Sequence, residues 1–339
     1  MDHDVCAEIR GQIHSTGIVR NVRIVVAGGT GFVGRALTHA LLARGDRVVI
    51  LTRGPGGLLA HACRECGAGG RLELINWTPD RPGPWMDHID GADVVVTLAG
   101  AGVSDERWTD DRKELLKSSR LLSTKLIAEA IDRAKVRPKA FIAASAIGVY
   151  GMRTGDAPIV ESALPGCDFL AKLAVEWEAA AKGAGVRTCH ARLGLVLGRG
   201  GGLFARLSPF FKAYMGGPLG DPAQFVSWVH LRDVVRAIEA MIDRPDLSGA
   251  FNVVSPEPVS MNELAAAFGE AFQRPAFFRV PAFAMKLAMG TEAAEAAFGG
   301  QRALPKRLTD AGFAFVFPDV RSALVDLVTS PKSRPIVAS

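Results

Sequence analysis

Residues 22–34 read Val22-Arg23-Ile24-Val25-Val26-Ala27-Gly28-Gly29-Thr30-Gly31-Phe32-Val33-Gly34, and this stretch decides the fold. A β-branched run enters a glycine-rich turn, and a helical pattern follows over 35–44. In such a unit Gly28 permits the tight turn, Gly31 lets the backbone approach a pyrophosphate, and Gly34 allows close packing of the helix. The stretch therefore predicts a dinucleotide site. Its expected contacts are Gly28, Thr30, Gly31, Phe32, Val33 and Gly34.

The end of the second predicted strand favours one form of the cofactor. NAD(H) sites usually place an acidic residue about twenty residues after the glycines, whereas this chain has Arg53 in that neighbourhood. A guanidinium pairs well with the 2′-phosphate of NADP(H), and Arg35 is a second candidate contact. The sequence therefore predicts NADP(H). The alternative is that Arg53 is a solvated loop charge.

The pattern of strands and helices predicts the fold class. Continuous apolar strands that alternate with amphipathic helices are typical of a parallel sheet covered on both faces. The expected strands are 22–27, 47–51, 93–98, 140–145 and 188–197, and the expected helices are 33–44, 112–133, 170–182, 234–242, 261–272 and 282–288. We predict an α/β fold, a doubly wound parallel-sheet Rossmann fold of about six or seven strands, with a smaller C-terminal substrate-side domain.

The domain boundaries follow a change to glycine- and proline-punctuated sequence after residue 198. We expect residues 22–198 to form the NADP-binding Rossmann domain, completed by 226–243. The substrate-side region then comprises 199–225 and 244–327. Residues 1–20 and 328–339 are expected to be a flexible extension and a flexible tail.

Composition excludes several classes of protein. The 339 residues are 48% hydrophobic and 22% charged, as in a globular protein with a substantial core. The formal charge of +5 comes from interspersed Lys and Arg without runs, so nucleic acid is not an expected partner. No apolar window is long enough to span a membrane, and no secretory signal opens the chain. We expect a soluble cytoplasmic protein with a small-molecule substrate.

The cysteines predict neither disulfides nor a metal site. The five are Cys6, Cys63, Cys66, Cys167 and Cys189, an odd number without the spacing of a disulfide scaffold. Cys63 and Cys66 lack a second pair of ligands at zinc-finger spacing. We expect reduced thiols.

Two further runs, Leu98-Ala99-Gly100 and Ser145–Gly151, together with the glycine spacing resemble the extended short-chain dehydrogenase/reductase superfamily. Other segments are similar to its sugar-nucleotide-epimerase-like, SulA-type subfamily: 107–109, 169–170, 176–180, 216–220, 227–230 and 300–308. The resemblance implies a Rossmann domain, NADP(H) and an epimerase or oxidoreductase of undefined substrate. It adds Leu98, Ala99 and Gly100 as cofactor contacts.

The chain departs from the superfamily in its expected catalytic motif. The superfamily uses Tyr-x-x-x-Lys, in which the lysine lowers the tyrosine pKa for proton exchange. This chain contains only Tyr150 and Tyr214, and neither begins that motif. Where the motif should fall, Lys172 matches the lysine, and either Asp168 or, in another register, Leu170 takes the place of the tyrosine.

Two residues are therefore candidate catalytic groups, Ser145 and Lys172. Ser145 precedes Val149-Tyr150-Gly151 and matches the assisting serine, although a shift of one residue would place Ala146 there. Its alternative role is a hydrogen bond at a strand end. Lys172 could instead form a surface ion pair with Glu176 one helical turn away. A bound water is the third candidate proton donor.

Tyr150, Arg192 and His230 are the candidate substrate-side residues. Arg192 matches the superfamily's substrate-side arginine, and a structural ion pair is the alternative. His230 precedes Asp233 as in the superfamily's domain junction. The alternative for this pair is packing and helix capping, with Asp233 as the N-cap of the helix 234–242.

Two functions are consistent with these residues. The first is an NADP(H)-dependent oxidoreductase or epimerase that acts on a small polar substrate, with a nucleotide-linked one as a candidate. The second is a regulatory or scaffold protein that binds the cofactor but has lost its proton donor.

Overall fold

The central element is a seven-stranded parallel sheet of order β10-β6-β5-β4-β1-β2-β3. The computed structural model describes residues 21–54, 70–103, 105–152, 156–279 and 300–329. The strands are β1 (Arg23–Ala27), β2 (Arg47–Thr52), β3 (Leu72–Asn76), β4 (Val94–Thr97), β5 (Ala140–Ala146), β6 (Arg187–Leu193) and β10 (Gly249–Val253). Because the strand order runs outward from β1 in both directions, the predicted doubly wound α/β fold is confirmed.

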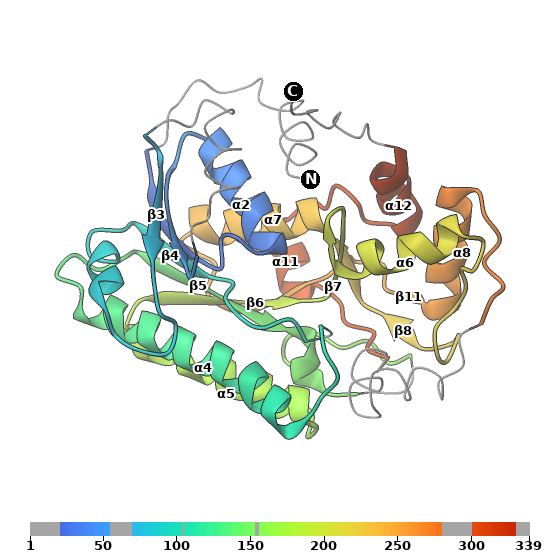
Figure 1. Cartoon of the computed structure of the whole chain (residues 1–339), viewed down its shortest axis with the longest axis horizontal. Helices are drawn as coiled ribbons and strands as arrows, with labels where there is room; N and C mark the ends of the chain where they lie inside the picture. The colour runs from blue at the N-terminus through green and yellow to red at the C-terminus, as the bar shows by residue number, and fades with distance from the viewer. Residues whose placement is uncertain (1–20, 55–69, 104, 153–155, 280–299, 330–339) are drawn as a thin grey trace.

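Helices cover both faces of this sheet (Figure 1). On one face lie α2 (Phe32–Ala43) and α7 (Leu231–Asp243), and on the other lie α4 (Asp110–Arg133) and α5 (Phe169–Ala180). Alternate residues of β1 point to opposite faces of the sheet. Ile24 and Val26 pack in the core with side chains of α2 and α7, and Val25 packs in the core with side chains of α4. Both faces are buried, which explains why the strands are continuously apolar.

The substrate-side region packs around a third core beyond the carboxyl ends of the strands, at the right of Figure 1. Its strands are β7 (Leu195–Gly198), β8 (Phe225–Val226), β9 (Trp228–His230) and β11 (Val259–Ser260). Its helices are α6 (Gly202–Lys212), α8 (Met261–Phe272) and α12 (Val320–Thr329), whereas α11 (Lys306–Asp310) packs against β10 of the main sheet. The buried Trp228, Phe211 and Phe268 lie in this core. Three short 3-10 helices complete the described elements: η1 (Pro84–His88), η2 (Ile147–Tyr150) and η3 (Lys182–Ala184).

The structure differs from the sequence prediction at three places. The strand expected over 188–197 is two strands, because Gly194 donates to the carbonyl of Val253 whereas Leu195 donates to that of Ser227. β7 therefore leaves the main sheet and pairs with β9. β10 joins the main sheet although 244–327 was assigned to the substrate side, and α12 continues into the range assigned to the tail. The helix expected over 282–288 lies outside the described residues.

Candidate functional site

The glycine-rich turn leaves an open position at the N-terminus of α2. Gly28 has a φ of +81°, and an added Cβ there would lie 2.7 Å from the carbonyl carbon of Leu98. A Cβ at Gly34 would overlap the carbonyl oxygen of Gly28, so the helix packs directly on the turn. Gly31 is exposed, and outside its chain neighbours an added Cβ would meet only the Gly28 oxygen, at 3.3 Å, among the described atoms. Gly31 thus leaves open space at the N-terminus of α2, the position at which a pyrophosphate is expected.

Three other residues of the turn, Thr30, Phe32 and Val33, have different surroundings. Thr30 is half-buried, and Val33 packs against the core under α2. The Phe32 ring contacts the connection between β7 and α6, since an added Cβ at Gly198 or Gly201 would lie 2.8 Å or 2.5 Å from ring atoms of Phe32. Phe32 therefore joins the turn to the substrate-side region.

Arg53 is exposed directly after β2, beside the same edge of the sheet as the turn. β1 and β2 are parallel neighbours, so their carboxyl ends, at Ala27 and Thr52, lie at one edge. Arg35 lies on the first turn of α2. Both guanidinium groups are therefore carried by elements that begin or end at this edge.

The run Leu98-Ala99-Gly100 lies beside the turn, at the end of β4. The Leu98 backbone N–H donates to the carbonyl of Ala27 at 2.8 Å. The close approach of Gly28 to Leu98 places this loop directly next to the turn. The loop and the turn are thus neighbours, as expected for two parts of one dinucleotide site.

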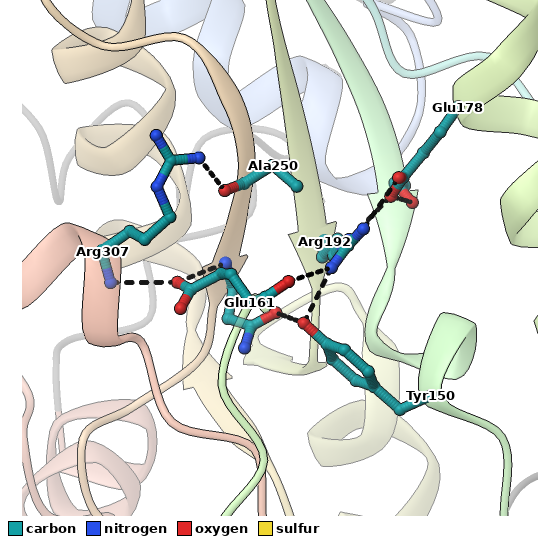
Figure 2. Close-up of polar contacts among 8 residues, drawn as sticks. Tyr150, Glu161, Glu178, Arg192, Ala250 and Arg307 are labelled. Atoms are coloured by element: carbon teal, nitrogen blue, oxygen red, sulfur yellow. Dashed lines mark hydrogen bonds and ion pairs between the residues drawn. The ribbon is translucent and has the colours of Figure 1, made fainter. Parts of the chain in front are cut away.

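Arg192 is buried and has an internal anionic partner, Glu178 of α5 (Figure 2). The Arg192 Nε and Nη2 atoms donate to the two carboxylate oxygens at 2.7 Å and 2.9 Å, a bidentate pair. Burial opposes the charged forms, but the hydrogen bonds and charge of the partner prevail: the pKa of Glu178 is lowered and that of Arg192 is raised. The structural ion pair, one of the two alternatives for Arg192, is therefore present.

Tyr150 is buried on the other side of Arg192 (Figure 2). Its hydroxyl donates to Asn252 Oδ1 at 2.6 Å and accepts from Arg192 Nη1 at 2.9 Å. Burial raises the pKa of Tyr150 despite the neighbouring guanidinium. A phenol that exchanges protons near neutral pH needs a lowered pKa, so Tyr150 lacks the property of a catalytic tyrosine.

Ser145 belongs to the same buried network. Its Oγ donates to Glu178 Oε1 at 2.7 Å. Ser145, Arg192 and Asn252 lie side by side across β5, β6 and β10. The expected hydrogen bond at a strand end is therefore present, and its acceptor is a side chain of α5.

The position of the missing tyrosine is occupied by a helix cap. Asp168 is the N-cap of α5 and accepts from the backbone N–H groups of Ala171 at 3.0 Å and Met152 at 2.8 Å. Lys172 is exposed. The proposed surface pair of Lys172 with Glu176 is wrong, because Glu176 pairs with Lys117 of α4 at 2.8 Å. Packing of α4 against α5 brings that competing lysine closer.

His230 is the N-cap of α7, so the assignment of Asp233 to that place is wrong. The Nδ1 atom of His230 accepts from the Arg232 backbone N–H at 3.1 Å. Asp233 lies within the first turn, fully buried, and accepts from the backbone N–H groups of Val316 at 2.8 Å and Phe317 at 2.9 Å. These two hydrogen bonds of Asp233 join the segment before α12 to the Rossmann domain.

Sequence reasoning missed Glu161, which completes the network, and the contacts that the motif over 300–308 makes with it through Arg307. Glu161 accepts from the backbone N–H groups of Asn252 and Arg307, each at 3.1 Å, and Figure 2 shows it beside Arg192. Gln301 donates to the carbonyl of Gly151. The motif thus holds the segment after β5 in place, and its own similarity to the subfamily was the available signal.

Family membership follows from comparison of the whole chain. Residues 24–254 match the NAD dependent epimerase/dehydratase family, and residues 280–327 match a domain of unknown function, DUF1731. The chain belongs to the NAD-dependent epimerase/dehydratase family. The resemblance to the extended short-chain dehydrogenases/reductases is confirmed, and the C-terminal match assigns the chain to the SDR39U1 type of epimerase family protein.

Relatives of this family member cover nearly its full length. The epimerase family protein Mb2239 of Mycobacterium bovis is 36% identical over 315 residues, which are 92% of this chain and 99% of the relative. The crystal structure of human epimerase family protein SDR39U1 (isoform 2) with NADPH has a TM-score of 0.79 and 31% identity, and covers 91% of this chain and 99% of the human chain. The nucleoside-diphosphate sugar epimerase from Corynebacterium glutamicum has a TM-score of 0.70 and 28% identity, over 96% of this chain and 61% of that chain.

The described residues of this family member form no cluster of three or more His, Cys, Asp or Glu side chains that could hold a metal ion. Cys63 and Cys66 lie outside them. Within the same ranges no helix is both long and apolar enough to cross a membrane.

Proposed function

We propose that this protein binds NADP(H) and acts as an oxidoreductase or epimerase on a small polar, nucleotide-linked substrate. The observation that carries the proposal is the open position at Gly31, at the N-terminus of α2, in a chain that is 31% identical to a protein crystallised with NADPH. The nucleotide-linked substrate is supported by the similarity to a nucleoside-diphosphate sugar epimerase. The cytoplasmic location stays a prediction.

The two phosphate groups of the cofactor each have a matching part of the chain. The free backbone N–H groups and the dipole at the α2 N-terminus favour the pyrophosphate. Arg53, exposed after β2, can pair with the 2′-phosphate. The bound dinucleotide would supply the hydride transfer, and the chain would bind it and orient it towards the substrate-side region.

The proton donor must differ from the family's tyrosine. Asp168, which takes the tyrosine's place, caps α5, and Tyr150 is buried with a raised pKa. The Ser145 hydroxyl already donates a hydrogen bond to the Glu178 carboxylate. Lys172 or a bound water is therefore the favoured donor, with Ser145 third.

A second function is supported by the internal hydrogen bonds of the side chains at the expected catalytic positions. If the engaged side chains near the end of β5 leave no proton donor, the protein would bind NADP(H) without turnover, as a regulatory or scaffold protein. The helix cap at Asp168 favours this alternative, because its carboxylate already accepts from two backbone N–H groups of the protein.

Nucleotide titration followed by a turnover assay separates the two functions. NADPH and NADH are titrated first, and then NADPH oxidation is followed with a panel of nucleotide-linked and small carbonyl substrates. Turnover that falls about a hundred-fold or more in Lys172→Met or Ser145→Ala identifies the group that transfers the proton. Tight NADPH binding without turnover supports the second function. Absence of NADPH binding would contradict both.

A further inference from the structure

Two arginines of α4 lie buried behind the loop that follows β4. Arg112 is 7% exposed and Arg120 is 9% exposed. They are about two helical turns apart, so they share a face of α4. Arg120 Nη2 donates to the carbonyl of Ala101 at 2.8 Å, and Arg112 Nη2 donates to that of Gly102 at 2.6 Å. Two consecutive carbonyls of one loop are thus held by two buried guanidinium groups.

The same loop touches the glycine-rich turn at its beginning. Leu98 lies against Gly28, as described above, and two residues later a Cβ added at Gly100 would lie 3.2 Å from the Arg120 Cζ. Contacts therefore run from the turn through the loop to Arg120. A change in the Arg120 side chain should move the loop relative to the turn.

The charge of these arginines is not balanced nearby. In the part of the chain that the structure describes, Arg120 has no carboxylate within ion-pair distance, and the Arg112 pair with Glu106 is 3.4 Å long with a carboxylate that is 68% exposed. The Nε atom of Arg112 is buried without a hydrogen-bond partner among the same residues. Burial and the neighbouring Arg112 lower the pKa of Arg120 to about 10, so the group is still charged at neutral pH.

A buried cation without a counter-charge is costly, and it is usually paired. Carbonyl dipoles and the Trp177 ring, 5.2 Å from the Arg120 Cζ, supply part of the stabilisation. The unbalanced positive charge would be further stabilised by an anion beside the loop. A dinucleotide pyrophosphate at the adjacent turn is such an anion.

We infer that Arg120, assisted by Arg112, is a positioning residue for the dinucleotide: it holds the loop over 98–102 against the glycine-rich turn and adds positive potential at the pyrophosphate. This inference rests on the proposed NADP(H) binding. It assigns to two side chains of α4 a role in a site otherwise built from backbone.

The test compares NADPH dissociation constants for wild type, Arg120→Met, Arg120→Lys and a control, each at several salt concentrations. Arg187→Met is the matched control, because Arg187 also donates to backbone carbonyls, of Leu247 at 2.7 Å, Met241 at 3.0 Å and Ile242 at 3.5 Å, but lies at the start of β6. Thermal unfolding checks that each variant is folded. Arg112→Met replaces Arg120→Met if the latter does not fold.

We expect Arg120→Met to weaken NADPH binding about tenfold or more and to make it less dependent on salt, since one positive charge is lost. Arg120→Lys should recover the salt dependence and part of the affinity. Arg187→Met should bind like the wild type. Equal affinity and equal salt dependence in wild type and Arg120→Met would overturn the inference alone, whereas a wild type that does not bind NADPH would overturn the proposed function.

Discussion

The glycine-rich turn and the network around Arg192 differ in how their polar groups are satisfied. At the turn, Gly31 is exposed, and among the described residues no side chain caps the first N–H groups of α2. In the network, Ser145, Tyr150 and Glu178 are bonded to one another or to Arg192. The first region leaves space beside a helix N-terminus, and in the second the side chains hold strands β5, β6 and β10 to α5.

This difference shows why family resemblance predicts the two regions unequally. A phosphate-binding turn requires only a backbone path and space, which glycines provide. A catalytic side chain requires that nothing else in the fold uses its hydrogen-bonding capacity. In this protein the residues that match the family's substrate side are already engaged internally.

The largest effect is expected at the turn itself. Gly31→Val should abolish NADPH binding while the protein stays folded, because the side chain fills the space at the helix N-terminus, where an added Cβ meets only the Gly28 oxygen among described atoms outside its chain neighbours. Titration with NADPH measures the binding, and thermal unfolding shows whether the variant is folded. Gly183→Val is the control, since a Cβ there meets no described atom within 4 Å. A folded Gly31→Val protein that binds NADPH would show that the turn is not the phosphate site.

The network should respond through stability. Arg192→Met leaves the half-buried Glu178 carboxylate without its cation and should lower the free energy of unfolding by about 3 kcal/mol. Urea unfolding measures this. The double variant Arg192→Met/Glu178→Gln should recover part of the loss, because the buried charge is removed. In contrast, Lys306→Met, which breaks the exposed pair with Asp310, should change stability little. An unchanged stability of Arg192→Met would contradict the structural role of the pair.

A smaller effect is expected for cofactor selectivity. Arg53→Ala should weaken NADPH binding about ten- to hundred-fold, a loss of roughly 1.5–3 kcal/mol, because a charge-assisted pair with the 2′-phosphate is removed. NADH affinity should not change. Arg47→Ala, at the exposed opposite end of β2, is the control. Equal affinities of the wild type for NADPH and NADH would refute the assignment of Arg53.

The smallest effect is the dependence of stability on pH. The pKa of Glu178 is lowered from its ordinary value of 4.5 by Arg192 and Ser145, against the effect of burial. A lowered pKa stabilises the folded state above the ordinary value, and this contribution is lost as the pH falls towards and through the folded-state value. Glu178→Gln should therefore flatten the acid side of the stability profile measured by urea unfolding. The control Glu129→Gln, on α4, should keep the acid side of the profile as in the wild type. Identical profiles for wild type and Glu178→Gln would contradict the prediction.

Several local features were predictable because they depend on neighbours in sequence. The helix 261–272 coincides with α8, which begins at a capping box formed by Ser260 and Glu263. Errors arose where distant segments compete. Glu176 pairs with Lys117 rather than with Lys172, and β7 separates from β6 because Ser227 offers a carbonyl to Leu195.

The sequence by itself determined the doubly wound fold, the glycine-rich turn and the absence of Tyr-x-x-x-Lys, because periodicity, glycine spacing and residue identity are local properties. The tertiary structure alone decided the partners of the remaining polar side chains. The Tyr150 hydroxyl meets an amide 102 positions away, and Ser145 meets a carboxylate 33 positions away. Such pairs form because buried polar groups need hydrogen-bond partners, and packing of the chain decides which groups meet. The spacing of residues in the sequence does not specify these partners.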